Sequence, residues 1–297
     1  MNFCNVVEIV TPKKVLLNGL WFGPQKSERT IIWIHGLGSS AFSRLGVVEK
    51  LVSDDTAVLT FNNRGHDFVS SLGKISGKKR TLAGAAYEKF EECVDDVQGA
   101  IDFAKAQGAK EIYLVGHSTG CQKAVYWAYK NANKSGKGVK GIILLAPVSD
   151  YAGAVKKYGL PKIRKLVTMS RALLKSGKGD DLLSQKIWAG EPDTPRRFIS
   201  LYTPDSVEQS IFSHFEPNKK AKILSAVRVP ILAILAEKDE FADRSAGVIV
   251  QWFETHTRAP LQSLVAKGAT HGFKEVEDSV AKAMTDWILR KIKTTIN

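Results

Sequence analysis

Residues 116–120, with the sequence GHSTG, have the types and spacing of a reactive serine turn. An apolar run at 112–115 precedes them and a helical stretch at 121–130 follows. In a G-x-S-x-G turn of this kind a strand passes sharply into a helix and presents the hydroxyl, here that of Ser118, at the rim of a sheet. The strand and helix cross so closely that glycine is required on both sides of the serine. The bare pattern is also typical of a solvated turn, but the flanking strand and helix favour the catalytic interpretation.

A second glycine loop, residues 35–40 with the sequence HGLGSS, follows the apolar run 31–34 and precedes a helix that we expect near residue 41. Such a loop can direct backbone N–H groups at a developing oxyanion. We predict that the amides of Leu37 and Thr119 form this oxyanion hole. Phosphate binding is the alternative, but the loop lacks the G-x-G-x-x-G and G-K-[ST] spacings.

An acidic residue stands at the end of the buried-strand pattern at 229–236. The carboxyl ends of parallel strands meet at one edge of a sheet, so an acid there lies on the same rim as the serine turn. Asp239 is the best candidate to orient a catalytic imidazole. Glu237, Glu240 and Asp243 are close enough in sequence to compete with it.

His271 follows the predicted strand 261–265 and precedes a C-terminal helix at 276–292. It completes the chain order serine, aspartate, histidine, so we predict Ser118, Asp239 and His271 as a catalytic triad. The other histidines have structural interpretations: His35 and His117 brace the glycine turns, His66 holds its loop or lines the site, and His214 and His256 are ordinary polar positions. Since no pair of histidines has a metal-binding spacing, we predict no metal.

These motifs resemble those of the α/β-hydrolase superfamily over almost the whole chain. Short stretches also resemble a fungal and plant family that includes siderophore esterases, at residues 17–21, 87–93, 116–121 and 197–202. The resemblance implies an α/β-hydrolase fold, with a mostly parallel eight-stranded sheet, helices on both faces and a helical lid inserted after the sixth strand. One loop departs from the pattern Asp-x-Arg-Gly-His-Gly-x-Ser of many relatives, because Asn62 and Asp67 replace its first Asp and second Gly.

The order of elements agrees with this fold class. Alternating strands and helices imply right-handed crossovers and a mostly parallel sheet covered on both faces. The strands are expected at 6–10, 15–22, 30–34, 56–61, 112–115, 141–146, 229–236 and 261–265, and helices near 41–52 and 82–106. Residues 70–80, rich in Gly, Ser and Lys, are predicted to form a mobile loop.

Residues 150–216 break the alternation, with a helical pattern at 156–174 and no clear strand, so we predict a lid inserted into a core of residues 1–149 and 217–297. Its aromatic residues are candidates to line an acyl or aryl pocket. The alternative, that they form the lid's own core, is at least as strong for most of them. The candidates for substrate binding are Trp188, Phe198, Tyr202 and Phe212.

Composition limits the partners. The chain has 297 residues, 44% of them hydrophobic, which is enough for a large core. Its three cysteines are too few and scattered for a disulfide framework, and the N-terminal residues lack a secretory pattern, so we expect a cytoplasmic protein. The formal net charge is +13, but no run of five basic residues occurs. We therefore expect a solvated basic face, with selection of carboxylated substrates as the weaker alternative, and no nucleic-acid or membrane partner.

The predicted function is that of a serine esterase, which cleaves carboxylic esters through an acyl-enzyme intermediate and needs no cofactor. The narrower resemblance makes bulky or siderophore-type esters a candidate class of small-molecule substrate. The alternatives are a thioesterase or acyltransferase, an amide or carbon–carbon bond hydrolase, and a slow-turnover ligand sensor. A monomer and a dimer are both compatible with the sequence.

Overall fold

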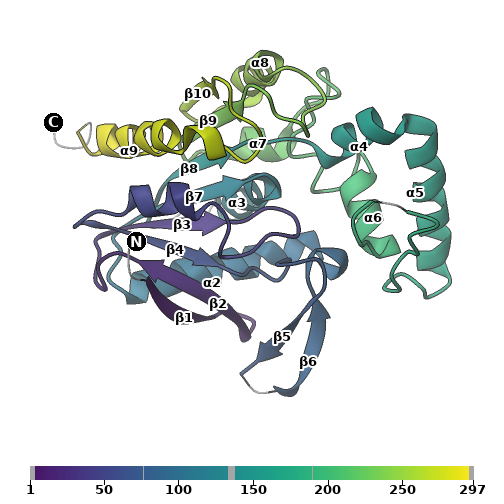
Figure 1. Cartoon of the computed structure of the whole chain (residues 1–297), viewed down its shortest axis with the longest axis horizontal. Coiled ribbons are helices and arrows are strands. Elements are labelled where there is room, and N and C mark those ends of the chain that lie inside the picture. The colour runs from purple at the N-terminus through teal and green to yellow at the C-terminus, as the bar shows by residue number, and fades with distance from the viewer. Residues whose placement is uncertain (1–3, 76, 133–137, 189, 294–297) are drawn as a thin grey trace.

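The computed structural model describes residues 4–75, 77–132, 138–188 and 190–293. Its strands join in one sheet, and helices cover both faces of that sheet (Figure 1). The strands are β1 (Cys4–Val10), β2 (Val15–Phe22), β3 (Arg29–Ile34), β4 (Thr56–Phe61), β5 (Ser70–Lys74), β6 (Gly77–Ala83), β7 (Glu111–His117), β8 (Val139–Leu145), β9 (Ile231–Ala236) and β10 (Leu261–Ala266). The α-helices are α1 (Leu45–Val48), α2 (Cys93–Ala106), α3 (Thr119–Lys130), α4 (Asp150–Tyr158), α5 (Leu160–Lys175), α6 (Pro195–Tyr202), α7 (Lys222–Ala226), α8 (Ala246–His256) and α9 (Glu277–Lys293).

The sheet order is β10-β9-β8-β7-β3-β4-β2-β5-β6, with β1 paired to β2. The strands from β10 to β4 in this order run parallel, whereas β1, β2, β5 and β6 pair antiparallel with their neighbours. All eight strands expected from the sequence are present, and the helical insertion follows the sixth of them, β8. The mostly parallel sheet with helices on both faces is therefore confirmed.

The central strands are apolar on both faces because helices cover both. In β3, Ile32 and Ile34 join one buried cluster with α2, α3 and α8, while Ile31 and Trp33 join another with α1 and α9. Successive side chains of a strand point to opposite faces, so a continuous apolar run supplies two cores at once. The two cores hold the sheet rigid where the loops of the site begin.

Two predictions of local structure are wrong. Of the predicted loop 70–80, residues 70–74 form β5 and residues 77–80 belong to β6. β5 pairs with the start of β2, and Arg80 reaches across to Ser71, so cross-strand pairing outweighs a loop-like composition. The helix expected from residue 82 begins at Cys93. Gly84 has φ of 98°, and a Cβ there would lie 2.7 Å from the Phe68 carbonyl oxygen, so the chain turns here instead of coiling.

The inserted segment is helical, as expected, but its long helix is broken in two at Gly159, where φ is 84°. Helices α4, α5 and α6 gather at the end of the molecule opposite α9 (Figure 1). They enclose a small apolar core of their own around Ile163, Phe198 and Leu201. Within the described residues, no helix is long and apolar enough to cross a bilayer.

Candidate active site

Four loops that leave the carboxyl ends of parallel strands carry the predicted catalytic groups. Leu37 follows β3, Ser118 follows β7, Asp239 follows β9 and His271 follows β10. Because these strands run parallel within one sheet, the four loops emerge at the same edge. Residues separated by more than 200 positions therefore share one rim of the molecule.

The turn at Ser118 has the strained geometry that the glycine spacing predicts. Ser118 lies at φ 55° and ψ −126°, outside the regions that L-residues favour. A Cβ on Gly116 would lie 2.4 Å from the carbonyl oxygen of Gly120, and a Cβ on Gly120 would lie 2.1 Å from that of Ile34. Both glycines are therefore needed for the strand and helix to cross, and the serine is held at the first turn of α3.

The structure brings Asp239 and His271 into direct contact. Nδ1 of His271 lies 3.0 Å and 2.8 Å from the two carboxylate oxygens of Asp239. Both side chains are buried, with 8% of the histidine and 4% of the aspartate exposed. Nδ1–H donates to the carboxylate in this arrangement, which leaves Nε2 as the second nitrogen available for proton transfer.

The three competing acids have other partners. Glu240 accepts a hydrogen bond from the backbone N–H of His271 at 2.9 Å, and Glu237 accepts one from the amide of Gly268 at 2.7 Å. Asp243 contacts His214 and Arg244 instead.

The environment of Asp243 explains why it stays an anion away from the imidazole. Burial pushes its pKa upward, but the hydrogen bonds from His214 and Arg244 outweigh burial and lower the pKa to about 2. His214 itself is 1% exposed, so the expectation of an ordinary polar position is wrong for this residue. His214 is buried against Asp243, 29 residues away in the chain, and the local sequence does not show this contact.

His35 and His117 support the two glycine turns. Nε2 of His117 donates to the carbonyl oxygen of His271 at 2.9 Å, and the two rings lie 5.0 Å apart. Nδ1 of His35 lies 2.8 Å from the carbonyl oxygen of Gly36. Burial lowers the pKa of both rings to about 3, aided at His35 by the Lys123 charge and at His117 by His271. Both rings are therefore neutral near pH 7, and they act as braces.

One predicted oxyanion donor is the residue after Ser118, and the other lies in the loop that packs against it. Thr119 begins α3, and Leu37 lies in the loop whose Gly36 packs against Ser118, where an added Cβ would approach the Ser118 Oγ to 3.4 Å. Across the described part of the chain, neither the Leu37 amide nor the Thr119 amide donates to another protein group. Two backbone N–H groups without a protein acceptor are the kind of donors from which an oxyanion hole is built.

The loop after β4 compensates for its departures from the family pattern. Oδ1 of Asn62 accepts a hydrogen bond from the backbone of Ala41 at 2.7 Å, so it ties this loop to the one after β3. Asp67 adopts φ of 53°, a left-handed conformation in which glycine is favoured and aspartate is tolerated. His66 contacts the carbonyl oxygen of Asn63 at 3.0 Å and holds its own loop.

The four aromatic candidates for substrate binding are buried. Trp188, Phe198 and Tyr202 pack against one another, with ring centroids 4.6–5.5 Å apart, in the apolar core of the lid. Phe212 packs against Phe253 in the core that lies between the sheet and helices α2, α3 and α8. Leu37, in the loop after β3, packs against this lid core.

Sequence reasoning missed a buried ionic cluster that joins the lid to the serine turn. Lys123, on α3, lies 2.5 Å from Glu88 and donates to Asn63 at 3.1 Å. Arg197, on the lid helix α6, lies 3.1 Å from the other oxygen of Glu88 and 2.6 Å from Glu208. All four charged side chains are at most 1% exposed.

The charges in this cluster stabilise one another. Burial pushes the pKa of Glu88 up, but the cations of Lys123 and Arg197 outweigh burial and hold the pKa below its ordinary value. The two buried cations therefore keep the Glu88 carboxylate ionised in the absence of solvent. One signal for this cluster was available: a lysine at position 123 stands in a helix whose other residues from Thr119 to Ala128 are all buried.

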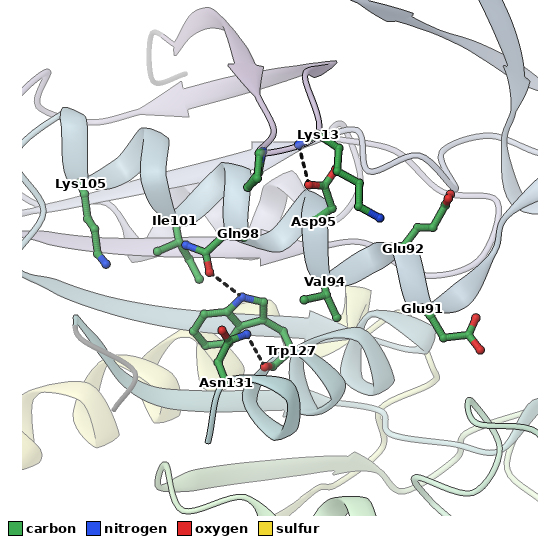
Figure 2. A pocket seen from close by; sticks show the side chains of 11 residues that line it. Lys13, Glu91, Glu92, Val94, Asp95, Gln98, Ile101, Lys105, Trp127 and Asn131 are labelled. Carbon is green, nitrogen blue, oxygen red and sulfur yellow. Dashed lines mark hydrogen bonds between the residues drawn. The ribbon is translucent and has the colours of Figure 1, made fainter. Parts of the chain in front are cut away.

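A cavity of about 540 Å³ is lined by none of the predicted site residues (Figure 2). It is lined by the β1–β2 turn, by α2 and by the end of α3, with the Trp127 indole donating to Gln98 at its floor. The carboxylates of Glu92 and Asp95 on its wall are paired with Arg64. None of the predicted site residues lines it, so its volume gives no information about the reaction at Ser118.

Comparisons with solved structures show the fold. Est1E from Butyrivibrio proteoclasticus, solved with ferulic acid, is 20% identical, with 97% of this chain and 99% of that chain covered and a TM-score of 0.62. The α/β hydrolase GrgF from Penicillium sp. sh18 is 16% identical over 97% and 98%, with a TM-score of 0.67. A thermostable carboxyl esterase from Bacillus coagulans, solved with glycerol, is 16% identical over 97% and 98%, with a TM-score of 0.61.

No curated protein matches the chain. The structural matches confirm the α/β-hydrolase fold, while the narrower resemblance to siderophore esterases stays a prediction. A sequence model of one family, described as protein of unknown function DUF1749, matches residues 81–297, which is most of the chain. The chain therefore belongs to the DUF1749 family and has the α/β-hydrolase fold of known esterases.

Proposed function

We propose that this protein is a serine hydrolase that cleaves carboxylic esters, with Ser118, His271 and Asp239 as its triad. The observation that supports this most directly is the buried hydrogen bond between His271 Nδ1 and Asp239, at the sheet edge where the strained serine turn ends. A neutral imidazole fixed at Nδ1 has Nε2 free to accept the serine proton.

In the proposed reaction His271 removes the proton of Ser118 as the hydroxyl oxygen attacks the ester carbonyl. The oxyanion accepts hydrogen bonds from the amides of Leu37 and Thr119. His271 then protonates the leaving alkoxide, and the acyl group stays on the serine. Water repeats the sequence and releases the acid, while Asp239 stabilises the imidazolium and does not take the proton.

The test is a panel of p-nitrophenyl esters of increasing acyl length, assayed with the wild-type protein and with Ser118→Ala. We expect turnover in the wild type and a loss of about 10³-fold or more in the variant, by analogy with other serine hydrolases. Stoichiometric labelling of the wild type, but not of Ser118→Ala, by a fluorophosphonate identifies the nucleophile separately. Equal turnover in both proteins would refute the proposal.

Bulky hydroxy-acid esters, including siderophore-type esters, are the candidate substrate class that the short sequence resemblance suggests. Two of its four stretches contain Glu88 and Arg197, which belong to the buried ionic cluster. These stretches therefore support a shared framework between lid and core. A bulky hydroxy-acid ester assayed beside an acetate ester of the same alcohol tests the substrate class itself.

A further inference from the structure

Two aromatic rings contact the imidazole of His271, one of them buried and the other exposed. The buried ring of His117 is 5.0 Å away. The exposed ring of Phe241 is 4.8 Å away, edge to face at 68°. Nδ1 is occupied by Asp239, so Nε2 is the nitrogen left for the reaction.

Phe241 is fixed at this place although its ring faces solvent. Its backbone N–H donates to Oδ1 of Asp239 at 3.0 Å. Its carbonyl oxygen lies against the lid helix α4, where a Cβ added to Gly153 would come within 2.7 Å of it. The next residue, Ala242, accepts a hydrogen bond from Lys156 of α4 at 2.7 Å. The ring therefore has a defined position between lid and core.

An exposed ring in so well fixed a segment needs an explanation. Phe241 is 56% exposed, whereas the aromatic candidates in the lid are at most 7% exposed. A single exposed ring is ordinary on a protein surface, but this ring contacts the candidate catalytic imidazole, and ligand sites combine apolar side chains with a few polar groups. The backbone contacts of Phe241 account for the position of the loop, but they do not require a phenyl side chain.

The direction of proton transfer identifies which half of an ester would meet this ring. When the tetrahedral intermediate collapses, the bond between the carbonyl carbon and the alcohol oxygen breaks, its electron pair goes to that oxygen, and the oxygen takes the proton from His271 Nε2. The alcohol half of the substrate must therefore lie beside the imidazole. The acyl half stays on Ser118, near the oxyanion amides.

We propose that Phe241 forms the alcohol-side subsite and that the protein prefers esters of aromatic or other apolar alcohols. The proposal rests on the proposed function of Ser118 and His271. Contact between the Phe241 ring and an aromatic alcohol adds a factor of about 3 to 10 over an alcohol too small to reach the ring. The carboxylate of Glu240, one residue earlier and bonded to the His271 backbone, disfavours alcohols that carry negative charge.

The experiment separates the two halves of the ester. One series keeps the acetyl group and varies the alcohol from methanol to benzyl alcohol, and a second keeps methanol and varies the acyl group from acetyl to phenylacetyl. Phe241→Ala should lower the benzyl-to-methyl ratio of kcat/KM by about 3- to 10-fold and leave the acyl ratio and the pH midpoint of kcat/KM unchanged. Phe42→Ala, which removes a ring that is 65% exposed in the loop after β3, is the matched control and should leave both ratios unchanged.

A proportional loss for every ester, or a shift of the pH midpoint, would mean that Phe241 only supports His271, and the proposal would be overturned. A second readout does not depend on turnover. Benzyl alcohol should show saturation-transfer NMR signals with Ser118→Ala and lose them with Ser118→Ala/Phe241→Ala. If no ester is hydrolysed, the proposed function fails, and the benzyl alcohol signal still decides whether the subsite exists.

Discussion

Replacing Arg197 with methionine removes a buried cation from between two buried carboxylates. Arg197 is 1% exposed and contacts Glu88 at 3.1 Å and Glu208 at 2.6 Å. Methionine fills a similar volume but leaves Glu208 without its ionic partner and Glu88 with Lys123 alone. Breaking a buried ion pair from one side destabilises a protein by about 3–5 kcal/mol, because an uncompensated charge stays in the interior.

This free energy corresponds to a fall in melting temperature of roughly 6–20 °C for a chain of this size. The assay is equilibrium unfolding in urea together with calorimetry, at constant pH and salt. The matched control is Arg196→Met in the preceding residue, which contacts Asp180 through side chains that are 41% and 64% exposed. A pair so exposed contributes about 0–1 kcal/mol, so the control should change stability little.

The double variant Arg197→Met/Glu208→Gln tests the explanation, because removing the orphaned charge as well should restore part of the lost stability. Limited proteolysis at the end of α5 reports whether the lid separates from the core first. If Arg197→Met destabilises the protein no more than Arg196→Met does, the ionic cluster does not fasten the lid, and the reasoning is wrong.

Three further predictions concern the turn, the triad and a buried acid. Gly120→Ala places a Cβ 2.1 Å from a β3 carbonyl oxygen and should sharply reduce the melting temperature and fluorophosphonate labelling. The control Gly247→Ala adds a Cβ in helix α8 with nothing within 4 Å, so it should be neutral or slightly stabilising. Equal effects of the two substitutions would contradict this prediction. Asp239→Asn should lower kcat by about 10³–10⁴-fold with little change in the melting temperature, and a decrease below tenfold would argue against its role in orienting His271. Burial raises the pKa of Asp193 from 3.8 to about 7, so the folded protein holds a proton that the unfolded chain releases between these values, and stability falls as pH rises from about 4 to about 7. Asp193→Asn should flatten that decline in urea unfolding between about pH 4 and about pH 7, and an unchanged slope would show that Asp193 does not cause it.

Local steric requirements explain why the serine turn was predictable. The glycines at 116 and 120 are demanded by backbone contacts within a few residues and one neighbouring strand, so their spacing records the turn directly. Continuous apolar runs likewise indicate strands covered on both faces, as Ile31 to Ile34 of β3 show by feeding two cores. The hairpin β5–β6 left no such record, because its pairing with β2 is a long-range contact.

The sequence by itself indicated the mostly parallel sheet, the helical segment after the sixth expected strand, and the candidate residues for nucleophile and base. Only the tertiary structure decided that Asp239, rather than Glu237, Glu240 or Asp243, contacts the His271 imidazole. The four acids lie within seven residues, and the sequence pattern does not show which way each side chain points. It alone joined Glu88, Lys123 and Arg197 into one buried cluster. Charges in a low-dielectric interior need partners, and chain topology determines which partners are within reach.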